Sequence, residues 1–123
     1  MLKVDTKEKF SVVRFTDGAF TANVSNNLAI FVTKQLQLPE KNIIIDFGNI
    51  VAADKQTLPE LAALYQLSSE NNASFVICNI QNNIKKLLDE LDLTDVLNIT
   101  PTESEAWDIV QMEEIERELL GDD

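Results

Sequence analysis

The chain has 123 residues, of which 45% are hydrophobic and 25% are charged, and this composition is typical of one globular domain. It contains no histidine and one cysteine, which excludes disulfides within the chain, thiolate zinc sites and every mechanism that uses imidazole as a base or metal ligand. Ten Lys and Arg against 21 Asp and Glu give a formal net charge of -11, which repels nucleic acid and anionic lipid. A charged partner is therefore expected to be basic.

The acidity is unevenly distributed along the chain. Residues 101–123 contain nine acidic side chains and one basic side chain, so most of the excess negative charge belongs to the C-terminal end. No uninterrupted apolar run approaches the roughly 18 residues of a membrane span, and the first residues lack the apolar core of a signal peptide. The sequence therefore predicts a cytoplasmic protein that binds no nucleic acid and does not insert directly into a membrane.

The N-terminal part of the chain predicts a β-hairpin followed by a helix. Two short runs, Leu2 to Asp5 and Phe10 to Phe15, flank a charged segment and are typical of paired strands. Asp17-Gly18 is a turn signal. A helix is then predicted up to Pro39, because apolar residues recur at helical spacing. These residues are Val24, Leu28, Phe31, Val32 and Leu36.

Two later apolar runs predict strands in the middle of a sheet. They are Ile43 to Phe47 and Ser74 to Cys78. An unbroken run of apolar, mostly branched residues leaves no side for water, so each strand is expected to be covered on both faces. We therefore predict that the two strands are neighbours, or near neighbours, inside the sheet.

Helices and one further strand separate and follow these runs. The apolar positions from Leu58 to Leu67 predict a helix that ends at Asn71-Asn72. Residues 84–91 have the clearest amphipathic pattern in the chain and precede a predicted short strand from Val96 to Ile99. Thr102 to Glu105 has the form of a capping box that opens a last helix. The alternation predicts an α/β fold with a mixed, mostly parallel sheet of about five strands and about four helices.

The loops that follow the strands contain no recognisable catalytic motif. The only glycines are Gly18, Gly48 and Gly121, from which no phosphate-binding loop can be built. Cys78 lies in an apolar run and is predicted to be a buried structural thiol. Asp46 follows three isoleucines and is predicted to have a turn or cap role, with a phospho-accepting aspartate as the alternative. We therefore expect no enzyme, no metal and no cofactor.

From Asn42 onward the chain resembles the STAS domain family, typified by the bacterial anti-sigma factor antagonists. In that family an apolar strand ending in Asp is followed, after a short segment, by Asp-Ser-Ser-Gly-Leu at the start of a helix. The run Ile43 to Ile50 is similar to the family's apolar strand and the segment after it. Asp54 and Leu58 match the first and last residues of the Asp-Ser-Ser-Gly-Leu motif. Residues 75–80 and 84–97 resemble the strand, helix and short strand that close the family domain. The resemblance extends to about residue 110.

The chain departs from the family at the motif itself. Lys55 and Gln56 stand where the family has two serines, and Thr57 stands at the glycine. In the anti-sigma factor antagonists, the first serine of the family motif is phosphorylated by a kinase that also acts as the anti-sigma factor. Phosphate at that serine abolishes binding. Lys55 has no hydroxyl, so this switch cannot operate at its usual position. The residues expected to bind a partner are Asp54, Lys55, Gln56, Thr57 and Leu58.

Three of these residues also have structural interpretations. Thr57 is predicted to cap the helix that begins there, with a phosphoacceptor as the alternative. Lys55 is either a solvated loop charge or a docking residue for an acidic partner. Asp54 is expected to be an alternative cap.

The C-terminal end extends beyond the family pattern. From about residue 111 the sequence predicts an acidic helical extension in which Met112, Ile115 and Leu119 form a stripe. This extension either packs on its own domain or forms a partner-binding or dimerising helix.

As a whole, residues 1–123 are expected to form one STAS-like domain that acts as a non-enzymatic bacterial regulator. It would bind an anti-sigma factor or a kinase-like regulator. The sequence does not decide whether the chain also forms a homodimer. The alternative is a small STAS subunit of a lipid-transport ATPase or of a stressosome-like assembly.

Overall fold

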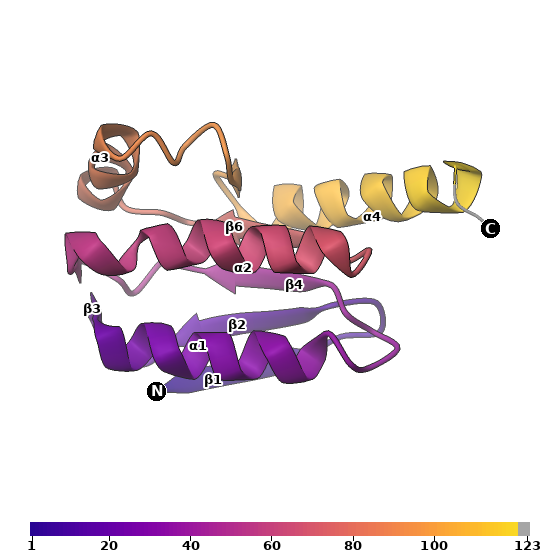
Figure 1. Ribbon diagram of the computed structural model, residues 1–123, viewed down its shortest axis with the longest axis horizontal. Coiled ribbons are helices and arrows are strands. Elements are labelled where there is room, and N and C mark those ends of the chain that lie inside the picture. Colours follow the sequence, from indigo (N-terminus) through magenta and orange to yellow (C-terminus); the bar gives the residue numbers. More distant parts are fainter. Residues whose placement is uncertain (121–123) are drawn as a thin grey trace.

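A five-stranded mixed sheet forms the centre of the structure, a computed structural model that describes residues 1–120 (Figure 1). The strand order is β1-β2-β4-β6-β7, and only the β1–β2 pair is antiparallel. The predicted fold class is therefore confirmed, including the opening hairpin. The five strands are β1 (Leu2–Thr6), β2 (Ser11–Phe15), β4 (Ile43–Asp46), β6 (Phe75–Cys78) and β7 (Asn98–Thr100).

Four α-helices cover the two faces of this sheet within the described residues. They are α1 (Ala22–Gln35), α2 (Pro59–Glu70), α3 (Asn82–Glu90) and α4 (Glu103–Leu120). In Figure 1, α1 and α2 lie side by side in front of the sheet. The larger hydrophobic core lies between the sheet and these helices, whereas α4 packs against the opposite face.

The predicted internal strands β4 and β6 are direct neighbours, and every residue of β6 is buried. Successive side chains of a strand point to opposite faces. Ile43 and Ile45 therefore belong to the larger core, while Ile44 belongs to the smaller one under α4. In that smaller core Trp107 of α4 stacks on Phe10, with ring centroids 4.5 Å apart.

One local prediction is corrected, and one element of the structure had not been predicted. The last strand begins at Asn98 rather than at Val96, because residues 93–97 form a turn in which the Val96 and Leu97 amides donate to the Leu93 carbonyl. A second, two-stranded parallel sheet, β3 (Ala19–Phe20) with β5 (Ala52–Ala53), was not predicted. Its strands are too short to carry a periodic pattern.

The hydroxyl half of the capping box predicted at the start of α4 is present. The Thr102 hydroxyl accepts the Glu105 backbone N–H at 3.2 Å and donates to the Glu105 carboxylate. From there α4 continues without a break through the predicted acidic extension to Leu120, and its last turns reach beyond the end of the sheet (Figure 1). Residues 121–123 of that extension lie outside the described residues. Over residues 1–120, no helix combines the length and the apolar character that crossing a membrane requires.

Candidate functional site

The carboxyl ends of β2, β4 and β6 meet at one edge of the sheet, where α/β proteins place their functional loops. Asp46, at the end of β4, is the centre of a polar cluster there. Its carboxylate accepts from Arg14 Nε at 3.2 Å, from the Gly48 backbone N–H at 2.8 Å and from Asn79 Nδ2 at 3.2 Å. Arg14 also pairs with Glu103 at the start of α4. The turn role predicted for Asp46 is confirmed.

This cluster surrounds a small cavity of about 310 Å³. Arg14, Asp46 and Asn79 line it, but their polar groups already bond to one another. A Cβ on Gly48 would approach Asp46 Oδ1 to 3.0 Å, so glycine allows the backbone to come this close to the carboxylate. The cluster therefore ties β2, β4 and α4 together. No group of three acidic or cysteine side chains suited to a metal occurs in the part of the chain that the structure describes.

The predicted partner-binding segment lies at the same edge, between β5 and α2. Residues Lys55–Thr57 form a short 3-10 helix, η1, directly after the β3–β5 ribbon. The Asp54 N–H donates to the Phe20 carbonyl at 3.0 Å, and the Val51 N–H donates to the Gly18 carbonyl at 2.8 Å. The small ribbon thereby fixes where the segment leaves the sheet.

Thr57 does not cap α2, so that prediction is wrong. Its hydroxyl donates to the carbonyls of Asp54 and Phe20 at 2.7 Å and 3.2 Å, and its side chain is buried. The position before α2 is Leu58, which has helical backbone angles and makes no side-chain cap. The reason is that η1 already turns the chain into the helix, which directs the Thr57 hydroxyl back toward β3. Asp54 likewise makes no side-chain cap at the start of η1.

The five predicted binding residues divide into exposed and buried groups. Asp54, Lys55 and Gln56 are exposed, whereas Thr57 and Leu58 point into the protein. Lys55 Nζ lies 2.9 Å from Glu90 Oε1 at the end of α3, and both side chains are at least half exposed. Only the first three residues therefore offer side chains to a partner, and the other two support their backbone.

The loop between β4 and β5, which precedes this segment, is held by side chains from the start of α3. Asn83 Nδ2 donates to the Val51 carbonyl at 2.7 Å, and Gln81 Nε2 donates to the Gly48 carbonyl at 2.8 Å. Together with the Lys55–Glu90 pair, these contacts join the turn before α2 to α3 across more than thirty residues of sequence. No local pattern in the sequence could have indicated these contacts.

Cys78 ends β6 and is fully buried in the smaller core, as predicted. Burial, followed by the nearby carboxylates of Asp46 and Glu103, raises the pKa of the thiol from 9.0 to about 12, although Arg14 acts in the opposite direction. At neutral pH the thiol is therefore protonated, shielded and a poor nucleophile.

We expect native Cys78 to resist alkylation by iodoacetamide at pH 8, and to react fully in urea. Intact mass would measure both reactions. Between pH 9 and about 12 the unfolded chain releases the thiol proton while the folded chain keeps it, so this thiol lowers stability as pH rises across that window. A Cys78→Ala variant should lose this part of the pH dependence. Rapid alkylation of the native protein would contradict the expected burial.

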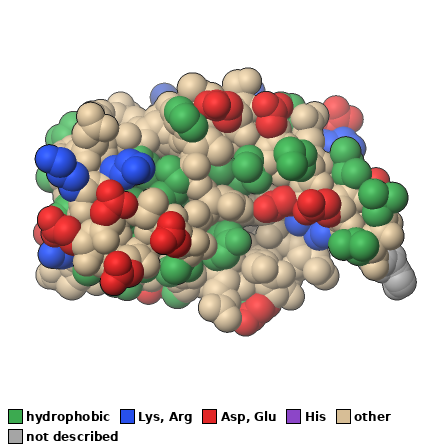
Figure 2. Space-filling view, turned by 90° about the horizontal axis from the view of Figure 1, so that it is seen from above, with side chains coloured by type: hydrophobic (Ala, Val, Ile, Leu, Met, Phe, Trp, Pro, Cys, Tyr) green, Lys and Arg blue, Asp and Glu red, His purple; other side chains and the backbone are tan. Residues whose placement is uncertain are grey.

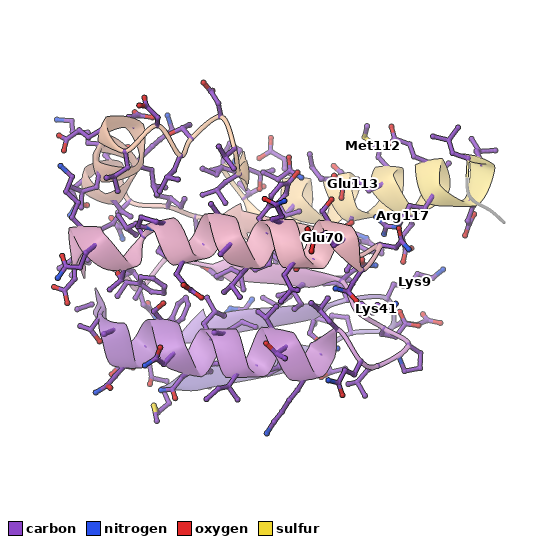
Figure 3. All side chains as sticks on the ribbon, in the orientation of Figure 1. Lys9, Lys41, Glu70, Met112, Glu113 and Arg117 are labelled. Atoms are coloured by element: carbon purple, nitrogen blue, oxygen red, sulfur yellow. The ribbon has the colours of Figure 1, made fainter. Side chains whose placement is uncertain are left out.

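A second polar network lies at the opposite end of the strands. There Asn42 and Ser74, which precede β4 and β6, bond to the second half of α4. Ser74 Oγ donates to Glu113 at 2.6 Å, Asn42 Nδ2 donates to Glu114 at 2.7 Å, and Arg117 donates to both Asn42 and Ser74. Figure 3 shows Glu113 and Arg117 turned toward the body of the molecule.

This network borders a groove of about 820 Å³ between α2 and α4. Sequence reasoning did not identify the network. The acidic residues of α4 were interpreted only by their charge, and the one useful signal was that Glu113 and Arg117 are spaced one helical turn apart.

Comparisons with known proteins agree on the fold. A family model described as "STAS domain" matches residues 1–106. A STAS domain protein, described as an anti-sigma factor antagonist, from Planctomyces limnophilus has a TM-score of 0.75 at 13% identity, with coverage of 89% of this chain and 97% of that one. The anti-sigma factor antagonist SpoIIAA of Bacillus, in its unphosphorylated form, has a TM-score of 0.73 at 17% identity, with coverage of 91% and 97%.

The same fold also occurs within a much larger protein. A murine Solute Carrier 26 family anion transporter has a TM-score of 0.65 at 13% identity over 88% of this chain but only 18% of its own. A comparison with curated protein sequences finds no match. At these identities the structural likeness establishes the fold alone.

Proposed function

Because the chain belongs to the STAS domain family, we propose that it acts as a cytoplasmic, non-enzymatic regulator that binds a protein partner through the turn before α2. The binding surface consists of Asp54, Lys55 and Gln56, which are exposed at the carboxyl edge of the sheet. Thr57 and Leu58 hold that turn from inside. One observation carries the proposal: the turn is exposed yet fixed by the β3–β5 ribbon and by α3, so little ordering is needed when a partner binds.

The proposed regulator works without the serine phosphoswitch of the anti-sigma factor antagonists. SpoIIAA is described in an unphosphorylated and a phosphorylated form. The resemblance to the family motif places Lys55 where the family has its phosphorylated serine, and the nearby hydroxyl of Thr57 is buried and donates to two carbonyls. A phosphate on Thr57 would have to break both bonds and enter the protein interior. Binding is therefore proposed to be constitutive. Lys55 puts a fixed positive charge at the position where the family carries its phosphoserine.

The test is a charge reversal at the centre of this surface. Lys55→Glu replaces the ion pair with two facing carboxylates, but both side chains are exposed, so the melting temperature should fall by no more than about 3 °C. The full chain first recovers its partner from a lysate of the source cells, and titration calorimetry then gives the affinity. Lys55 is proposed to face an acidic patch of the partner, so Lys55→Glu should weaken binding at least about tenfold, because like charges across an interface are costly.

Two controls separate docking from other effects of charge. Lys34→Glu makes the same change at an exposed site on α1 and should leave affinity within about twofold of the parent. Glu90→Ala removes the ion pair but keeps Lys55, so it should bind at least as well as the parent. If Lys55→Glu binds like the parent while it remains folded, the turn is not the interface. A transporter subunit as the recovered partner would favour the alternative role in a lipid-transport ATPase.

A further inference from the structure

The face of α4 that points away from the sheet carries a row of large apolar side chains. Met112, Ile115 and Leu119 lie at spacings of three and four residues and are 59%, 55% and 80% exposed. We call these three residues the α4 stripe. The residues of α4 that face the sheet, Ala106 and Val110, are fully buried on the other side of the same helix. Figure 3 shows Met112 pointing away from the rest of the molecule.

The helix that carries this stripe is fixed along its inner side. Ser74 and Asn42 hold Glu113, Glu114 and Arg117 at the amino ends of the strands. The stripe is therefore presented on a rigid, preformed helix, which lowers the entropy cost of binding. This part of α4 lies beyond residue 106, where the match to the family model ends.

The charges beside the stripe indicate what can cover it. Asp108, Glu116 and Glu118 are exposed on α4. Arg117 is the only basic residue of this helix, and it bonds inward to Asn42 and Ser74. Figure 2, which looks onto this side, shows apolar side chains toward the C-terminal end, with acidic side chains and some Lys or Arg side chains near them.

These charges disfavour a second copy of the chain as the occupant. Two such stripes packed together would bring the Asp and Glu side chains of one α4 against those of the other, with no Lys or Arg from either helix face between them. Anionic lipid is disfavoured for the same reason. A basic amphipathic helix satisfies both features, because its apolar positions cover the stripe and its Lys and Arg meet the acidic rim.

We propose that the α4 stripe docks an amphipathic helix of a partner protein whose flanking residues are basic. This surface is separate from the turn before α2, since the turn lies at the carboxyl ends of the strands, whereas this part of α4 is held by Asn42 and Ser74 at their amino ends. The proposal therefore stands or falls independently of the function proposed above.

Two synthetic helical peptides test the proposal with the full chain. Both carry leucines at spacings of three and four. One has lysine and arginine at the flanking positions, and the other has glutamate there. By fluorescence anisotropy, the basic peptide should bind at least tenfold more tightly than the acidic one, and its affinity should fall as salt is raised.

Matched variants show whether the stripe is the site. Ile115→Ser should weaken binding of the basic peptide at least fivefold, and Ile115→Ser with Leu119→Ser should weaken it further. Ile30→Ser is the control, because Ile30 on α1 is 56% exposed and so closely matches Ile115. It should change affinity less than twofold. Circular dichroism should report the same helix content for all variants.

Three results would overturn the proposal. The first is equal binding of both peptides, and the second is an equal effect of Ile115→Ser and Ile30→Ser. The third is a dimer in sedimentation velocity that Ile115→Ser dissociates, since the occupant would then be a second copy of the chain. A monomer whose binding of the basic peptide depends on the stripe would support it.

Discussion

Changing Phe47 to alanine is expected to destabilise the protein by about 3–5 kcal/mol, a large part of the stability of a domain of this size. Phe47 is fully buried just after β4. Its ring lies edge-on to Phe15 at 5.4 Å and tilted to Phe20 at 5.3 Å, so the substitution removes two aromatic contacts and leaves a cavity between them. Urea unfolding should show the loss as a lower midpoint with an unchanged slope.

The same substitution should also disturb the turn before α2. The carbonyl of Phe20 accepts from both the Asp54 N–H and the Thr57 hydroxyl, so a displaced Phe20 moves the proposed binding surface. Phe31→Ala on α1 is the control, because Phe31 is only partly buried; it should cost about 1–2 kcal/mol. Equal losses for the two variants would contradict the central place of Phe47 in the core.

The second large effect is expected for Val110→Asp in the smaller core. Val110 is fully buried between α4 and an apolar sheet face that includes Val12, Ile44 and Val76. An aspartate there would be a buried charge among apolar side chains, and the expected loss is about 4 kcal/mol or more. Trp107, the only tryptophan, stacks on Phe10, so its fluorescence reports directly whether α4 leaves the sheet.

Met112→Asp provides the matched control for this prediction. It makes a change of the same kind two residues further along α4, where the side chain is 59% exposed. The expected cost is within about 0.5 kcal/mol, with unchanged tryptophan fluorescence. If Val110→Asp were as stable as Met112→Asp, α4 would not be an essential cover of the sheet.

The regular elements could be predicted because their residues are periodic. Ile43 to Ile45 and Phe75 to Cys78 are apolar at every position, and only two-sided coverage tolerates this, so their place inside the sheet followed directly. The sequence could not indicate which helix covers which face. That depends on which distant residues share a core, such as Val110 and Ile44, which are separated by more than sixty residues.

The candidate site was less predictable than the fold. The resemblance to the STAS family located the turn at residues 54–58, but the role of each side chain depended on neighbours distant in sequence. Thr57 has the spacing of a capping residue, yet the passing β3 strand offers a carbonyl to its hydroxyl. Lys55 looked like a free loop charge, yet Glu90 lies beside it. Local rules describe what a side chain can do, and the tertiary structure decides which of these options it takes.

The position of α4 in the chain has a consequence for biosynthesis. Every strand of the sheet precedes α4, so the ribosome completes the whole sheet before the helix that covers its second face. Until then Phe10, Val12, Ile44 and Val76 form an uncovered apolar surface on the nascent chain. Domains fold as units, and exposed apolar sheet surface favours aggregation, so the emerging chain passes through a stage at which chaperones would recognise it. That stage ends when α4 emerges and covers this face of the sheet.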